Sequence, residues 1–207
     1  MHFLLAMRLI RHEARTFIIR QWTGLSDDRI RKLYRCYVLE ADSYSVMRHR
    51  GKSPRQTAFF FRNPELCFQA SQLASLFIVY GLLYAGSLGL ESRYRLGSLD
   101  SGALLCQAYE AYIELHTPAR ISFEHAWFLL MALARREEIG AARCAACGGV
   151  RLKDLLAKRQ SSCANCEPPG APPPAAAGSA SSGAEVDHAC TQPGVRGLAR
   201  YPANGLR

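Results

Sequence analysis

Apolar residues recur at near-helical spacing through about the first twenty residues of the chain, with arginines between them. The apolar set comprises Leu4, Leu5, Met7, Leu9, Phe17, Ile18 and Ile19. This period predicts one amphipathic helix from Met1 to about Gln21. Gly24 is expected to end this helix and Ser26 to cap a second one, because glycine tolerates the left-handed conformation after a helix and a serine hydroxyl accepts from free amides at a helix start.

The segment around Gly24 has the apolar spacing of a helix-turn-helix. The positions that would hold its two helices together are Ile19, Leu25, Ile30 and Leu33. The outward face of the second helix would present cations to DNA phosphates or base edges. These candidate DNA contacts are Arg29, Arg31, Lys32 and Arg35. An ordinary helical hairpin with a basic solvent face explains the same residues equally well.

Residues 48–57 form a basic stretch that Gly51 and Pro54 interrupt, so a loop is predicted there. Its cations extend the candidate DNA contacts by Arg48, Arg50, Lys52 and Arg55. Three adjacent phenylalanines, Phe59–Phe61, follow at once. Aromatic rings beside a basic stretch can stack on nucleic-acid bases, but adjacent phenylalanines more often hold a loop on the core. Core packing is therefore the preferred interpretation.

The most apolar part of the chain follows Pro64. Leu66–Leu90 contains no charged residue, which leaves a membrane span open as an alternative. Glutamines, serines and glycines dilute its apolar character, so a buried central helix to about Ala85 is favoured. The looser connection expected after this helix contains Gly86, Gly89 and Gly97.

Two further helices are predicted before the cysteine-rich region. The first covers about residues 99–116 and ends before Pro118, with Leu104, Ala108, Tyr112 and Leu115 facing inward. The second is capped by Ser122 and ends at Gly140, with Phe123, Trp127, Leu130, Met131 and Ala134 facing inward. Together these periods predict a mainly α protein, a helical bundle with an amino-terminal, helix-turn-helix-like hairpin.

Two Cys-x-x-Cys pairs, Cys144 with Cys147 and Cys163 with Cys166, are separated by a loop of 15 residues. Each pair places two sulfurs on one side of a tight turn, and two such turns can enclose a four-coordinate ion. Zn²⁺ is the favoured metal, one ion per chain, and four cysteine ligands leave no position for a substrate. A structural zinc-knuckle lobe with four cysteine ligands is therefore expected at the carboxy-terminal side of the bundle. Two disulfides are disfavoured, because they would need an oxidising compartment. Iron, or a redox role for the cysteines, remains the alternative to zinc.

The chain of 207 residues carries a formal charge of +9, and this charge is unevenly distributed. Residues 1–60 hold 12 Lys and Arg against 5 Asp and Glu, residues 61–130 hold 4 against 6, and residues 131–169 hold 7 against 4. Two basic regions on a neutral body suit a protein that follows nucleic-acid phosphates, although a solvated basic surface explains the charge equally well. Arg8 and Arg11 interrupt the apolar start before a signal sequence can form, so a cytoplasmic location is expected.

Four cysteines lie outside the two pairs; Cys36, Cys67 and Cys106 are in predicted helices and are interpreted as buried, and Cys190 in the tail is interpreted as a free thiol. The 6 histidines lack a metal-ligand spacing and are interpreted as surface or hydrogen-bonded core residues. From Pro168 the composition changes to proline, alanine, glycine and serine, which predicts disorder. The expected regions are a helical domain over 1–140, a four-cysteine zinc-binding lobe over 141–169 and a disordered tail over 170–207.

The order of these motifs resembles the FlhC family, which supplies one of the subunits of the bacterial flagellar master transcriptional activator. The resemblance covers about residues 3–169. Its most specific parts are Leu25-Ser26 through Leu33-Tyr34, Ala126-Trp127, Cys144-x-x-Cys147-Gly148-Gly149 and Cys163-x-x-Cys166-Glu167-Pro168-Pro169.

This resemblance implies a helical, non-enzymatic subunit that binds zinc through the four matching cysteines. It also implies a hetero-oligomer with an FlhD-like partner, binding to double-stranded promoter DNA of flagellar operons, and recruitment of RNA polymerase, with no membrane and no small-molecule substrate. The alternative is a zinc-stabilised protein-interaction module that leaves DNA contact to its partner. A zinc enzyme is disfavoured, because the chain has neither an H-x-E element upstream of a cysteine pair nor an open ligand position.

Overall fold

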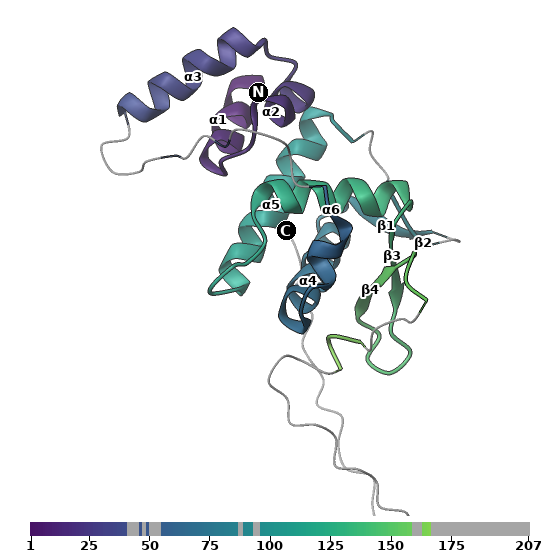
Figure 1. Ribbon diagram of the computed structural model, residues 1–207. Coiled ribbons are helices and arrows are strands. Elements are labelled where there is room, and N and C mark those ends of the chain that lie inside the picture. The colour runs from purple at the N-terminus through teal and green to yellow at the C-terminus, as the bar shows by residue number, and fades with distance from the viewer. Residues whose placement is uncertain are drawn as a thin grey trace, which may run out of the picture. The chain divides into compact units, whose positions relative to one another are not determined.

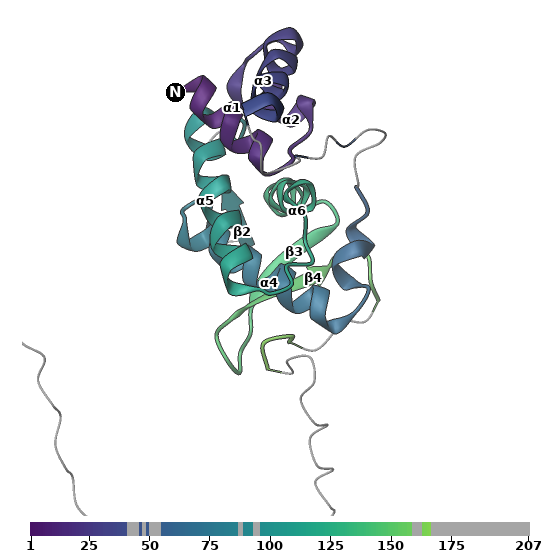
Figure 2. The same ribbon diagram turned by 90° about the vertical axis from the view of Figure 1, so that its left-hand side faces the viewer.

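A computed structural model describes residues 1–40, 46, 49, 55–86, 89–92, 96–158 and 163–166 (Figures 1 and 2). The chain divides into two units, Met1–Ala171 and Pro172–Arg207, and all described residues belong to the first. The expected mainly α fold is confirmed, since six α-helices dominate the described part. The tail expected to be disordered lies outside the described residues, and the division of the remainder at residue 140 stays a prediction.

The helices are α1 His2–Arg11, α2 Thr16–Thr23, α3 Asp27–Glu40, the 3₁₀-helix η1 Thr57–Phe61, α4 Pro64–Val79, α5 Leu99–Leu115 and α6 Phe123–Arg135. The strands are β1 Leu83–Gly86, β2 Gly89–Ser92, β3 Ile139–Arg143 and β4 Val150–Asp154. They form two antiparallel hairpins, with Leu83 opposite Ser92 in one and Ile139 opposite Asp154 in the other. Figures 1 and 2 show α1–α3 grouped at one end of this unit and the β3–β4 hairpin beside α4.

The amino-terminal segment forms two helices, so the prediction of one helix to about Gln21 is wrong. The break is at Glu13, which has a positive φ of 58°. The Tyr34 hydroxyl of α3 donates a hydrogen bond of 2.6 Å to the Ala14 carbonyl. A tertiary contact from α3 therefore stabilises a break that no local glycine or proline signals.

The predicted turn between α2 and α3 is confirmed. Gly24 is left-handed, with φ of 67°, and its amide donates to the Arg20 carbonyl at 2.8 Å. Three of the four predicted contact positions, Ile19, Leu25 and Ile30, are buried, and Leu33 is partly buried against the same core. The α2–turn–α3 segment thus has the internal packing of a helix-turn-helix-like hairpin.

The central helix α4 ends at Val79, about six residues before the predicted end. The chain then turns at Gly81, whose φ is 75°, and forms the β1–β2 hairpin where a loose connection was expected. Glycine permits this turn because it has no Cβ to clash in the left-handed region. No described helix is long and apolar enough to cross a membrane.

Helix α5 has nearly the predicted bounds, and Ser122 caps α6 by accepting a hydrogen bond from the His125 amide. Helix α6 nevertheless ends at Arg135 and not at Gly140, because Arg136 adopts the left-handed conformation with φ of 57°. Gly140 lies in β3. The inward face of α5 is also shifted, since Leu115 is 65% exposed whereas Leu105, Cys106 and Tyr109 are buried.

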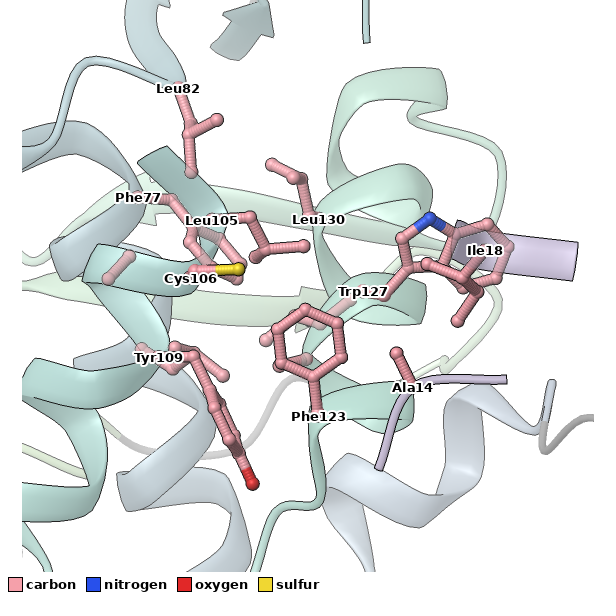
Figure 3. Packing of buried hydrophobic residues seen from close by; sticks show 14 of the residues in the cluster. Ala14, Ile18, Phe77, Leu82, Leu105, Cys106, Tyr109, Phe123, Trp127 and Leu130 are labelled. Carbon is pink, nitrogen blue, oxygen red and sulfur yellow. The ribbon is translucent and has the colours of Figure 1, made fainter. Parts of the chain in front are cut away.

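Helix α6 contributes Phe123, Trp127 and Leu130 to the core, near Ala14 and Ile18 of the amino-terminal segment and Tyr109 of α5 (Figure 3). The Trp127 ring contacts Phe17 edge to face at 5.3 Å between centroids, and the Phe123 ring contacts Tyr109 in the same way at 5.1 Å. The expected core packing of the adjacent phenylalanines is confirmed for Phe60, which is fully buried, while Phe59 and Phe61 are partly buried against the core.

The contact between α1, α2 and α5 depends on Gly102. A Cβ at this position would lie 2.6 Å from Trp22 Cε3 and 2.8 Å from Leu5 Cδ2. Gly102→Ala should lower the free energy of unfolding, since overpacking costs about 1–3 kcal/mol and outweighs a helix-propensity gain of up to about 1 kcal/mol. Urea denaturation measures the change, with exposed Gln107→Ala on the same helix as a control. A stabilised Gly102→Ala variant would contradict this packing.

Candidate metal centre and basic surface

The first cysteine pair forms the turn that joins β3 to β4. Arg143 pairs with Val150 at the end of the hairpin, and the Cys144 amide donates to the Gly149 carbonyl at 2.9 Å. The Gly148 amide then donates to the Cys144 carbonyl at 2.9 Å, with Gly148 in the left-handed region at φ of 70°. These bonds direct the backbone so that Cys144 and Cys147 share one side of the turn, as the spacing predicts.

The second cysteine pair lies in a shorter turn that is attached to the first. The Cys166 amide donates to the Cys163 carbonyl at 3.0 Å. Between them, the Asn165 side-chain nitrogen donates to the Val150 carbonyl at 3.0 Å, and its oxygen accepts from the Gln72 side chain at 2.9 Å. Sequence reasoning missed Asn165 because a Cys-x-x-Cys pattern treats this position as variable. The one available signal for Gln72 was a polar residue within the uncharged segment Leu66–Leu90.

The four sulfurs converge into one cluster, which we call the cysteine cluster. Its members are Cys144, Cys147, Cys163 and Cys166, and their sulfurs all lie within 4.8 Å of one another. Two sulfur pairs, Cys144 with Cys166 and Cys147 with Cys163, are separated by 3.6 and 3.8 Å. Tetrahedral zinc with Zn–S bonds of about 2.3 Å needs sulfur separations of about 3.8 Å. The donor set and its spacing therefore fit a four-coordinate metal ion.

The electrostatics of the cluster favour thiolate at one position. Backbone N–H groups of Cys147 and Ala146 lower the pKa of Cys144 to about 6 by stabilising its thiolate. Hydrogen bonding to the sulfurs of Cys147 and Cys144 raises the pKa of Cys166 to about 12, because its thiol proton is shared with these neighbours. A divalent cation placed among the sulfurs would replace such protons and stabilise all four thiolates.

The remaining cysteines differ in exposure. Cys67 and Cys106 are buried as predicted, and burial raises the pKa of Cys106 to about 12, which keeps it in the unreactive thiol form. Cys36 is exposed, so the prediction that it is buried is wrong. It lies on the exposed side of α3, whose residues of described burial turn Ile30, Leu33 and Tyr34 toward the core. Cys190 lies outside the described residues.

The predicted basic residues divide into two groups. Arg29, Arg31, Lys32 and Arg35 are all exposed on α3, and Arg55 is exposed just before η1. Arg31 is paired with Asp28 at 2.7 Å, so part of its charge is offset locally. Arg48, Arg50 and Lys52 lie outside the described residues. Figures 1 and 2 place α3 at the opposite end of the unit from the β3–β4 hairpin, so the cations of α3 and the cysteine cluster are separate sites.

Two ion pairs that the sequence did not indicate connect the amino-terminal helices to the body. Arg8 of α1 forms two hydrogen bonds with Glu110 of α5, and His12 contacts the same carboxylate at 2.8 Å. The Arg8 guanidinium holds the pKa of Glu110 below its usual value, while burial lowers the pKa of His12. Arg15 at the start of α2 pairs with Glu124 of α6 at 2.7 Å.

No family model matches the chain. A curated relative, the flagellar transcriptional regulator FlhC of Verminephrobacter eiseniae strain EF01-2, is 32% identical over 166 residues. The alignment covers 78% of this chain and 78% of the relative. This identity over most of both sequences supports the resemblance that the order of the motifs suggested. The motifs are the helix-turn-helix-like hairpin, the helix with Ala126-Trp127 and the cysteine cluster. The chain belongs to the FlhC family.

Proposed function

We propose that the chain is a zinc-containing, DNA-binding subunit of a cytoplasmic transcriptional activator of flagellar operons. The observation that carries this proposal is its relationship to a flagellar transcriptional regulator over 78% of both sequences. By analogy with the family, it acts in a hetero-oligomer with an FlhD-like partner on promoter DNA and helps to recruit RNA polymerase. Its role is regulatory and not enzymatic.

The proposed metal is one structural Zn²⁺ held by Cys144, Cys147, Cys163 and Cys166. Support comes from the convergence of four sulfurs at separations suited to a tetrahedral ion. Zinc favours thiolate ligands in this geometry, and a fully occupied set of protein ligands is typical of a structural site. The residues around the ion would then hold the β3–β4 hairpin against α4.

The proposed DNA contacts are the exposed cations of α3 together with Arg55, Arg48, Arg50 and Lys52. Four cations on one exposed helix provide the charge needed to neutralise phosphates. A second candidate, an interaction module that leaves DNA to its partner, is favoured by the two acidic residues in the first turn of α3. Asp27 and Asp28 lie beside these cations, and Asp28 is paired with Arg31.

Charge reversal on α3 separates the two candidates. The triple variant Arg29→Glu, Arg31→Glu, Lys32→Glu should still assemble with the partner subunit, because the three side chains are exposed. If all three contact phosphates, promoter affinity falls and the slope of log affinity against log salt becomes shallower by roughly 2.7, about 0.9 per phosphate. Fluorescence anisotropy with promoter DNA over a salt series measures both.

The matched control conserves charge: Arg29→Lys, Arg31→Lys, Lys32→Arg should retain both the slope and the assembly of the complex. The mass of the co-expressed complex checks assembly. If the reversed variant assembles and binds promoter DNA with the wild-type affinity and slope, α3 does not contact DNA, and the interaction module is favoured.

A further inference from the structure

Asn165 connects three parts of the structure through one side-chain amide. It lies between Cys163 and Cys166, donates to the Val150 carbonyl at the start of β4, and accepts from Gln72 of α4. These two hydrogen bonds, together with the sulfur contacts, join the described segment 163–166 to the β3–β4 hairpin and to α4. The position of the second cysteine pair therefore depends on this side chain.

The first cysteine pair is shaped to receive the amide of Asn165. A Cβ at Gly149 would lie 2.6 Å from Asn165 Nδ2 and 3.3 Å from the Cys147 sulfur. Contacts under 3.0 Å do not occur for real Cβ atoms, so a glycine is required if Asn165 is to reach the Val150 carbonyl. The absence of a Cβ at Gly149 thus allows the two cysteine turns to lie close together, in addition to permitting the bend of its own turn.

The other partner of Asn165 belongs to an element that is held independently of the cysteines. Helix α4 carries Glu65, Gln69 and Gln72 in a sequence whose other polar residues are Ser71 and Ser75. Gln69 is 3% exposed, and its oxygen accepts from the Tyr112 hydroxyl and from the Arg120 amide at 3.0 Å. Gln72 consequently extends from a helix that is already fixed to α5 and to the segment before α6.

We propose that Asn165 is a positioning residue for the cysteine cluster and that Gln72 and Asn165 together set its metal affinity by holding the second cysteine pair against α4. The inference rests on the proposed metal site. Residues behind a metal's direct ligands orient those ligands, and removing them typically weakens binding about 10–100-fold. Here the effect arises because, without the amide, binding must also order the segment that carries Cys163 and Cys166.

The test is a zinc titration of the full-length protein against a chromophoric chelator. Asn165→Ala should bind zinc about 10–100-fold more weakly than wild type. Gln72→Ala, which leaves the cysteine segment unchanged, should weaken binding in the same direction by a smaller factor. Because Gln72 acts through Asn165, the double variant should bind no more weakly than Asn165→Ala alone. Gln107→Ala, at an exposed position of α5, is the control and should bind like wild type.

Cobalt substitution tests whether the ligand set is retained. The visible absorption of Co²⁺ bound to four thiolates should persist in Asn165→Ala at saturating metal, which shows weakened positioning and not the loss of a ligand. Wild-type affinity in Asn165→Ala, or additive losses in the double variant, would overturn the inference. If Asn165→Ala fails to fold, the zinc affinity of Gln72→Ala is the test. Wild-type zinc affinity in Gln72→Ala would also overturn the inference. A wild-type protein that binds no metal would instead refute the proposed zinc site.

Discussion

Cys163→Ser should release zinc and unfold the part of the chain formed by the β3–β4 hairpin and the second cysteine pair. An isolated two-stranded hairpin is marginally stable, and in β3 and β4 the fully buried apolar side chains are Ile139 and Leu152. If the proposed zinc binds here, its binding free energy therefore contributes to the folding free energy of this part of the chain. Zinc at about 1,000 times its dissociation constant contributes about 4 kcal/mol to the free energy of unfolding, which the variant loses.

Thermal unfolding of wild type and variant, each with and without chelator, measures this contribution, and elemental analysis gives the zinc content. Chelator should lower the wild-type midpoint and leave that of Cys163→Ser unchanged. Cys36→Ser is the matched control, because Cys36 is an exposed cysteine on α3 outside the cysteine cluster. It should retain zinc and the chelator response. Equal wild-type stability with and without chelator would refute a structural role for the metal.

The cysteine cluster was predictable because most of its geometry is local. A Cys-x-x-Cys pair sets the distance between two sulfurs within one turn, and Gly148 supplies the left-handed residue that such a turn needs. The meeting of the two turns is not local. It uses the amide of Asn165 and the missing Cβ of Gly149, whose pairing only the folded structure reveals.

The helix boundaries show a similar limit. Gly24 and Ser122 were correct signals, because glycine and serine act on the backbone beside them. Glu13 and Arg136 end helices with positive φ although their residue types do not indicate it. At Glu13 the reason is tertiary, since the Tyr34 hydroxyl holds the Ala14 carbonyl. Local propensity cannot report a partner that is contributed by another helix.

The ion pairs of the amino-terminal helices were the least predictable contacts. Arg8 and Glu110 are 102 positions apart, and Arg15 and Glu124 are 109 positions apart. Sequence spacing identifies charged partners only within a helix, at separations of three or four residues. The pairs nevertheless determine how the helix-turn-helix-like hairpin is attached to the body, because each joins an amino-terminal helix to α5 or α6.

Glu124→Gln should be among the most destabilising single changes outside the cysteine cluster. The Arg15 and Glu124 side chains are 14% and 7% exposed, with 2.7 Å between Nε and Oε2. Glu124→Gln breaks this largely buried ion pair by removing the carboxylate charge, and breaking such a pair typically costs about 3–5 kcal/mol. The variant also removes a negative charge from the first turn of α6, where the helix dipole favours it. Urea denaturation of the full-length protein measures the loss.

Asp28→Asn is the matched control, since it breaks an ion pair of the same length in which both side chains are more than half exposed. It should change the free energy of unfolding by less than about 1 kcal/mol, because solvent screens exposed pairs. The double variant Arg15→Met, Glu124→Leu should recover most of the stability lost in Glu124→Gln, because apolar residues of similar volume commonly replace a buried ion pair without loss. If Glu124→Gln costs no more than Asp28→Asn, the Arg15–Glu124 pair does not hold α2 to α6.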